Sequence, residues 1–163
     1  MKLDFSEISD WMEFENLVVA FFEGAKENGD NNVFIVETKP TGIGADGGRD
    51  IFVTFGLNDS IINFQRKWVV QCKFHKKAIS KSNLADINIP SLIHEYNADG
   101  YLLVCKSVVS SELTRSFENL ERNCKFGYKY VIWNGNDFGL KLVDKKNILK
   151  NYFPQYSKIN EII

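Results

Sequence analysis

The chain lacks any apolar run long enough to cross a membrane. The longest one extends only from Leu17 to Phe22, whereas a membrane-spanning helix needs about 20 consecutive apolar residues. The charged start Met1-Lys-Leu-Asp-Phe5 also lacks the features of a secretory signal peptide. We therefore expect a protein with no membrane partner.

Paired cysteines are missing as well. The three that occur, Cys72, Cys105 and Cys124, form no Cys-x-x-Cys motif, which argues against both disulfides and a zinc site. Cys72 and Cys105 fall within apolar segments, so they are expected to be small buried thiols. Free thiols of this kind predict a reducing compartment, and hence a cytoplasmic protein.

The chain has almost no net charge, since its formal charge is −1. Its basic residues are nevertheless unevenly distributed, because the segment from Ser60 to Leu84 contains no acid. Such a block can attract phosphates locally, or it can protect a solvated edge strand. The basic residues of this segment are Arg66, Lys67, Lys73, Lys76, Lys77 and Lys81, accompanied by His75.

Motifs of several nucleotide-binding and DNA-reading classes are absent. Gly42, Gly44 and Gly47 spell Gly-x-Gly-x-x-Gly, but a dinucleotide site needs a helix directly afterwards. Here the strand-like run Ile51–Phe55 follows, which excludes that interpretation. The chain also has no Walker-type Gly-Lys-Ser/Thr, no helix-turn-helix and no zinc finger.

The remaining pattern predicts one α/β domain over residues 1–154. A helix begins after Asp10, its expected N-cap, and ends at Gly29. Three strands, a helix, a strand, a helix, a strand and a last helix follow, and residues 155–163 form a tail or a linker to a region absent from this chain. The expected strands are 33–36, 51–55, 67–74, 101–105 and 128–133; the expected helices are 80–98, restarting at Pro90, then 110–123 and 142–153; residues 39–48 and 134–136 are expected to be a connection and a turn.

Connections between these segments predict the sheet. The first three strands should be antiparallel neighbours, while the strands that follow crossover helices should run parallel. The expected fold is therefore a three-layer α/β/α sandwich, with a mixed five-stranded sheet between helices.

Polar residues alternate with apolar ones along the strand 67–74. Gln71 and Lys73 share one face, and the apolar set Trp68, Val70, Cys72 and Phe74 makes the other face the core face. A hairpin centred between Ser60 and Ile61 would place Asp50 directly opposite Gln71, with Cβ atoms roughly 5 Å apart. Gln71 and Lys73 would then lie on a face kept for function.

A carboxylate, an amide and an ammonium around one point suit a hard cation such as Mg²⁺ or Mn²⁺. Asp50 and Gln71 are the candidate metal ligands, Lys73 the group that orients a water or neutralises a phosphate. One acid is too little for a tight site, so we expect a second from Glu15, and the backbone carbonyl of Cys72 as a further ligand. Glu15 lies at the edge of the helix's apolar stripe, where it can instead reach water or pair with a lysine.

These residues together resemble a known family. Phe14-Glu15 on the first helix, Asp46-Gly-Gly-Arg-Asp50 before a strand, and Gln71-Cys-Lys73 on the next resemble the PD-(D/E)XK nuclease superfamily, most of all its Mrr-like restriction endonucleases. The resemblance implies a restriction-endonuclease-like fold with Asp50, Gln71, Lys73 and Glu15 as catalytic residues. It differs in two places: glutamine replaces the usual acid at 71, and Arg49 replaces the proline.

The resemblance implies a Mg²⁺-dependent endonuclease that hydrolyses double-stranded foreign or modified DNA, as the effector domain of a restriction or anti-phage defence protein. The alternatives are an inactive nuclease-like module that binds nucleic acid or serves assembly, and a structure-specific repair or junction nuclease. Because a duplex has two strands, we expect a homodimer or higher homo-oligomer, formed here or through domains absent from this chain. Expected DNA contacts are His75, Lys76, Lys77, Lys81 and Arg49.

Overall fold

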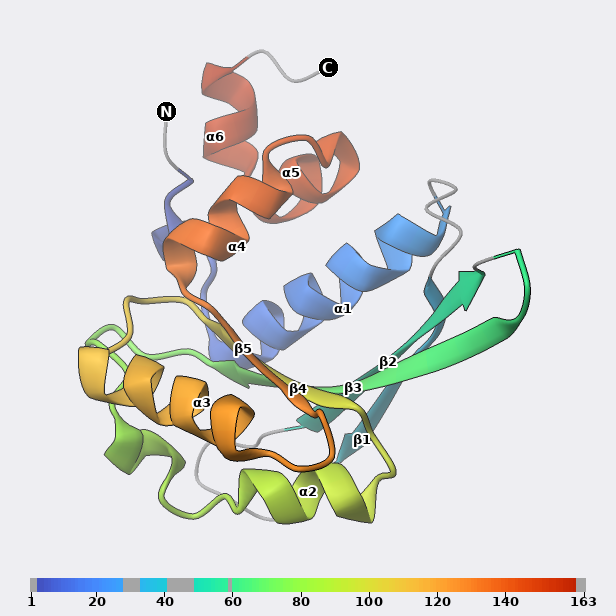
Figure 1. The fold of residues 1–163 in the computed structure, drawn as a ribbon. Coiled ribbons are helices and arrows are strands. Elements are labelled where there is room, and N and C mark those ends of the chain that lie inside the picture. Colours follow the sequence, from blue (N-terminus) through green and yellow to red (C-terminus); the bar gives the residue numbers. More distant parts are fainter. Residues whose placement is uncertain (1–2, 28–32, 41–48, 59, 161–163) are drawn as a thin grey trace.

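The computed structural model describes the backbone of residues 3–27, 33–40, 49–58 and 60–160, and the side chains there except those of residues 25–27, 33–36, 38–40, 49, 50, 57 and 58. The predicted element order is confirmed along most of the chain (Figure 1). The elements are η1 (Phe5–Glu7), α1 (Trp11–Glu27), β1 (Val33–Pro40), β2 (Arg49–Asn58), β3 (Asn63–Lys73), η2 (Lys81–Leu84), α2 (Ile89–Glu95), β4 (Gly100–Cys105), α3 (Ser111–Asn123), β5 (Lys129–Trp133), α4 (Gly135–Leu142), α5 (Lys146–Tyr152) and α6 (Pro154–Ile159).

The strands form one mixed sheet in the order β1-β2-β3-β4-β5. β1, β2 and β3 are antiparallel neighbours, and β3, β4 and β5 run parallel, as the connections predict. The β2–β3 register runs from Ile51 opposite Val70 to Asn58 opposite Asn63. This hairpin is therefore centred between Ser60 and Ile61, the arrangement whose register would place Asp50 opposite Gln71.

Helices cover both faces of the sheet, so the fold has three layers (Figure 1). On one face, strand residues such as Val70 and Val104 pack with α1, α4 and α5 in one hydrophobic cluster. On the other face, residues such as Val69 and Leu103 pack with η2, α2 and α3 in a second cluster. Odd and even positions of β3 therefore belong to two different cores. The predicted core face of β3, which carries Val70 and Cys72, is confirmed, and the face of Gln71 and Lys73 also packs against helices.

α1 begins with the predicted cap. The Glu13 amide donates to Asp10 Oδ1 at 2.8 Å, and the Glu13 carboxylate accepts from the Ser9 amide at 2.6 Å. Such bonds satisfy amides that a helix leaves without intrahelical partners. The apolar stripe of the helix then packs on the sheet, with Phe14, Leu17 and Val18 fully buried.

The strands at the N-terminal side are longer than the sequence pattern indicates. β1 continues to Pro40, although residues 39 and 40 were expected in a loop, and residues 41–48 lie outside the described residues. β2 and β3 also extend through the polar segment between them, to Asn58 and from Asn63. Hydrogen bonding along the ladder holds polar residues in strand conformation there, so side-chain patterning underestimates the strand length.

The C-terminal quarter contains three helices where the sequence predicts one. The expected turn at 134–136 is instead the start of α4, because Asn134 Oδ1 accepts from the amides of Asn136 and Asp137. The predicted helix 142–153 corresponds to the end of α4 and to α5, and the expected patternless tail contains α6. Glu7 holds α6 in place, since its carboxylate accepts from the amides of Gln155 and Tyr156.

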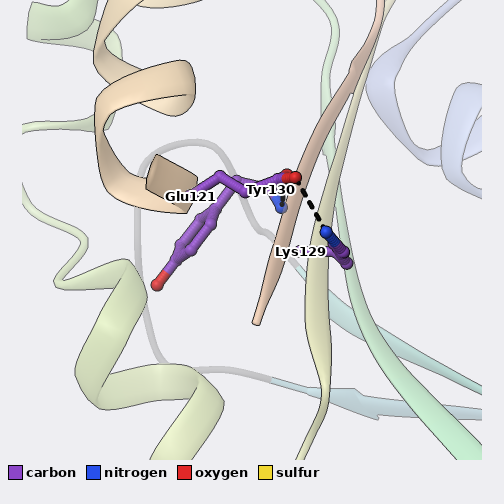
Figure 2. Close-up of polar contacts among 3 residues, drawn as sticks. All are labelled: Glu121, Lys129 and Tyr130. Atoms are coloured by element: carbon purple, nitrogen blue, oxygen red, sulfur yellow. Dashed lines mark hydrogen bonds and ion pairs between the residues drawn. The ribbon is translucent and has the colours of Figure 1, made fainter. Parts of the chain in front are cut away.

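Polar contacts also attach α3 to the edge strand β5. Lys129 Nζ donates to Glu121 Oε1 at 3.0 Å, and the Tyr130 amide donates to Glu121 Oε2 at 3.2 Å (Figure 2). These bonds hold the pKa of the Glu121 carboxyl below its usual value. In the described ranges, no helix combines the length and apolar character needed to cross a membrane.

Candidate active site

The end of β3 presents Gln71 and Lys73 on the same face of the sheet. They pair with Leu103 and Cys105 of β4, both of which belong to the cluster under α2 and α3. Each polar side chain is half-buried. The predicted sharing of one face is therefore confirmed, and the shared face is the one that α2 and α3 cover.

Asp50 lies in β2 next to this pair along the hairpin. Its backbone pairs with Lys39 of β1, and the β2–β3 ladder begins one residue later with Ile51 opposite Val70. One further step of the same register places position 50 opposite position 71. In the described ladders, Gln71, Cys72 and Lys73 pair with β4 alone, so β3 extends beyond its pairing with β2 where these residues lie. The side chain of Asp50 lies outside the described residues.

Gln71 is oriented by a tyrosine that the sequence analysis did not single out. The hydroxyl of Tyr101, on β4, donates to Gln71 Oε1 at 2.5 Å. Tyr101 is fully buried in the cluster that α2 and α3 cover. Packing therefore fixes its ring, and the hydrogen bond from its hydroxyl fixes the orientation of the Gln71 amide. An amide oxygen has two lone pairs, so it can accept a hydrogen bond and bind a cation at the same time. The only sequence signal was a phenol in an otherwise apolar buried strand.

Glu15 lies on the opposite side of the sheet from Gln71 and Lys73. It is only 4% exposed on α1, so the alternative in which it reaches water is wrong. Its carboxylate acts on the thiol of Cys72, whose pKa is raised well above its usual value by burial first and by Glu15 second. Cys72 belongs to the face that α1 covers. The structure thus brings Glu15 to the middle of the Gln71-Cys72-Lys73 segment, but from the other face.

The thiols near these residues stay protonated at neutral pH. Burial raises the pKa of Cys105 to about 12, although the nearby ammonium of Lys73 acts in the opposite direction. A protonated thiol is a poor metal ligand and a poor nucleophile. The polar groups able to act here are therefore the oxygens of Glu15 and Gln71, the backbone carbonyls and the Lys73 ammonium.

The donor set suits a hard divalent cation only if Asp50 contributes. Among the described side chains, no group of three or more His, Cys, Asp or Glu residues gathers as a metal cluster. Gln71 Oε1 and the Cys72 carbonyl are oxygen donors at the β3 segment beyond the β2 ladder. Hard divalent cations such as Mg²⁺ prefer oxygen ligands. They need only one or two carboxylates when phosphates and waters complete the coordination shell.

A second lysine, Lys106, lies at the same end of the parallel strands as Lys73. The Lys106 amide donates to the Lys73 carbonyl at 3.1 Å, and the Lys106 ammonium lies 3.9 Å from the centre of the Phe74 ring. Lys106, Lys76 and His75 line a cavity of about 570 Å³. Burial and, next, the charge of Lys76 lower the pKa of Lys106. Lys106 was missed because it lies far from the basic block in sequence.

The other predicted DNA contacts are more scattered. Lys77 is exposed, and its carbonyl accepts from Ser107 Oγ at 2.8 Å. Lys81 is exposed at the start of η2, on the α2–α3 side of the molecule. Arg49 pairs through its backbone with Pro40, and its side chain lies outside the described part of the chain.

Comparisons with known proteins identify the family and a shared fold. The Mrr_cat family model, described as restriction endonuclease, matches residues 7–149. Among solved structures, the DNA modification-dependent restriction endonuclease AspBHI is similar over 99% of this chain, with a TM-score of 0.51 and 14% sequence identity, which shows a shared fold. This chain spans 42% of the length of that protein. No curated protein matches by sequence.

Proposed function

Because the chain belongs to the Mrr-like restriction endonuclease family, we propose that it is a metal-dependent endonuclease that hydrolyses phosphodiester bonds in foreign or modified DNA. Its role would be that of the effector domain of a defence protein. The observation that carries the proposal is the placement of Gln71 and Lys73 on one face of β3, one register step from Asp50 of β2.

The residues divide the reaction between them. Asp50, Gln71 and the Cys72 carbonyl would hold Mg²⁺ or Mn²⁺, with Glu15 approaching Cys72 from the α1 side. A bound cation of this kind supplies a usable water nucleophile near neutral pH and balances charge on the phosphate. Lys73 would orient the attacking water and stabilise the negative charge that develops as the P–O bond to the leaving oxygen breaks. The products are a phosphate monoester and a hydroxyl.

DNA would lie across the C-terminal ends of β3 and β4. Lys73 and Lys106 are joined there by a backbone hydrogen bond and belong to opposite faces. His75, Lys76 and Lys77 follow directly, and lysines that contact phosphates supply affinity without sequence specificity. Hydrolysis of both strands of a duplex needs two active sites, so we propose that the active form is a homodimer.

Plasmid cleavage tests the proposed function. Wild-type protein should convert supercoiled plasmid to nicked and linear forms with Mg²⁺ and should do nothing with excess EDTA. Asp50→Asn keeps the side-chain size but removes the charge that holds the cation, so cleavage should fall about 10³-fold. Asp86→Asn, at an exposed acid, is the matched control and should cleave normally. Equal cleavage by Asp50→Asn and wild type would refute the assignment of Asp50.

Tyr101→Phe tests the orientation of Gln71. Loss of the hydroxyl removes a hydrogen bond that orients the Gln71 amide, so we expect the Mg²⁺ concentration for half-maximal cleavage to rise about 10-fold, in the range known for residues that orient metal ligands. Tyr130→Phe removes the hydroxyl of another buried tyrosine in the same core and should leave the Mg²⁺ dependence unchanged. A slower Tyr101→Phe enzyme with the wild-type Mg²⁺ dependence would show a purely structural role.

A non-catalytic DNA-binding module is the second candidate. The observation that favours it is the position of Glu15 across the sheet from Gln71 and Lys73, which leaves Asp50 as the one carboxylate proposed on their side. This candidate predicts no cleavage with either Mg²⁺ or Mn²⁺. It also predicts DNA binding that weakens steeply with salt. The plasmid assay therefore separates the two candidates directly.

A further inference from the structure

A cavity of about 640 Å³ lies between α2, α3 and the loop that leads into β5. Its aromatic end, Phe126 and Tyr128, directly precedes Lys129, the first residue of β5. Lys129 pairs with Gly100, the first residue of β4, whereas Lys73 pairs with Cys105 at its other end. The aromatic end of the cavity therefore lies at the opposite end of the parallel strands from the proposed active site.

Three rings form one cluster at this end of the cavity. Phe126 stacks on Tyr128, with centroids 5.5 Å apart, and His94 of α2 contacts both rings edge-on at 5.1 and 5.2 Å. The Tyr128 hydroxyl lies 3.1 Å from His94 Nδ1 in a hydrogen bond. Phe126 is nevertheless 70% exposed. The cluster thus holds a large apolar ring in a defined orientation at the surface.

The loop that carries Phe126 and Tyr128 is held at defined points. Gly127, between Phe126 and Tyr128, has φ of +71°, a conformation that favours glycine. After the glycine, the Lys129 ammonium and the Tyr130 amide both donate to the Glu121 carboxylate of α3 (Figure 2). An exposed ring that is fixed in this way loses little conformational entropy when a planar ligand stacks on it.

Basic residues line the same cavity as the rings. Lys81, Arg115 and Lys125 line the same cavity, and Glu112 is the one acid among its lining residues. An exposed ring beside a surplus of positive charge is complementary to a planar ligand that carries negative charge. A purely apolar partner would leave these cations without a function, whereas a nucleotide uses both features, since its base stacks and its phosphate pairs.

We propose that this cavity binds an unstacked base of a single-stranded DNA segment, with the base on Phe126 and the flanking phosphates near Arg115 and Lys125. DNA is the expected source of the base because the chain belongs to a family of DNA-cleaving enzymes. The cavity would hold a displaced or unpaired strand away from the active site. This site goes beyond the proposed hydrolysis and does not depend on it.

Binding of a labelled single-stranded oligonucleotide to the full chain tests the site. Anisotropy is measured in EDTA, where the proposed hydrolysis does not run, so an inactive enzyme would leave this test intact. Phe126→Ala should weaken binding about 10-fold, since stacking on one aromatic side chain typically contributes that much. Phe126→Leu should weaken it similarly because leucine has no π face, while Phe126→Trp should bind as well as wild type.

Leu140→Ala is the matched control, since Leu140 is 72% exposed on α4, outside this cavity, and its loss should change nothing. Duplex DNA of equal length should bind without dependence on Phe126. Wild-type affinity of Phe126→Ala or Phe126→Leu, or an equal loss of duplex binding in Phe126→Ala, would overturn the proposal. So would binding of free mononucleotides without binding of the oligonucleotide, because the ligand would then not be a DNA strand.

Discussion

Lys73→Ala is expected to reduce plasmid cleavage by about 10²–10⁴-fold, the range for loss of a group that handles a proton or balances charge in the transition state. Lys73 belongs to the same face as Gln71 and lies where β3 extends past its pairing with β2. It is half-buried beside Cys105, a thiol that stays protonated at neutral pH. Single-turnover cleavage of a labelled duplex at saturating Mg²⁺ measures the effect.

Two further variants make that result specific. Lys150→Ala removes an exposed lysine of α5 and should cleave at the wild-type rate, which controls for a general loss of positive charge. Lys73→Arg keeps the charge but not the ability to give up a proton. Recovery of activity with arginine would assign Lys73 a purely electrostatic role. Wild-type cleavage by Lys73→Ala would remove Lys73 from the active site altogether.

Phe138→Ala is expected to lower the free energy of unfolding by about 3–5 kcal/mol, the usual cost of emptying a buried aromatic site. Phe138 lies on α4 and is fully buried in the cluster that α1 covers. Small domains have free energies of unfolding of only about 5–15 kcal/mol. This variant should therefore lose a large part of its stability. Its ring contacts, with centroids 5.6–6.2 Å apart, are Phe5, Phe14, Phe21 and Trp133.

Urea denaturation followed by tryptophan fluorescence measures this loss. Leu140→Ala, two residues further along the same helix and 72% exposed, should stay within about 0.5 kcal/mol of wild type. A loss below about 1 kcal/mol in Phe138→Ala would mean that neighbouring rings collapse into the space. It would also mean that α4 contributes little to the core.

The β2–β3 hairpin shows what local patterning can and cannot determine. Alternation along β3 assigns Gln71 and Lys73 to one face without any knowledge of the rest of the fold, because the side-chain period of a strand is two. A hairpin centred between Ser60 and Ile61 is one register that the two strand patterns allow, and it is the register in the structure. The shared face depends on residues close together in the chain, so the sequence specifies it, whereas the long polar segment between the strands leaves their register open.

The errors arise where distant parts of the chain meet. Asn134 is of a residue type typical of turns, but it caps α4. This helix packs through Phe138 into the cluster that α1 covers. Residues after Pro154 have no strong apolar period, yet they form α6, because the Glu7 carboxylate accepts two of its amide hydrogen bonds. Short helices of this kind depend on tertiary contacts for most of their stability, which local patterns do not record.

By itself, the sequence determined the family resemblance, the order of the main helices and strands from α1 to β5, and the shared face of Gln71 and Lys73, since each follows from motifs or from local periodicity. The tertiary structure decided which helix covers which face of the sheet. That choice buried Glu15 across the sheet from Lys73, brought the Tyr101 hydroxyl to Gln71, and attached Lys106 to the end of β3. The physical reason is that layer packing depends on burying apolar surface over the whole domain, which no short stretch of residues specifies.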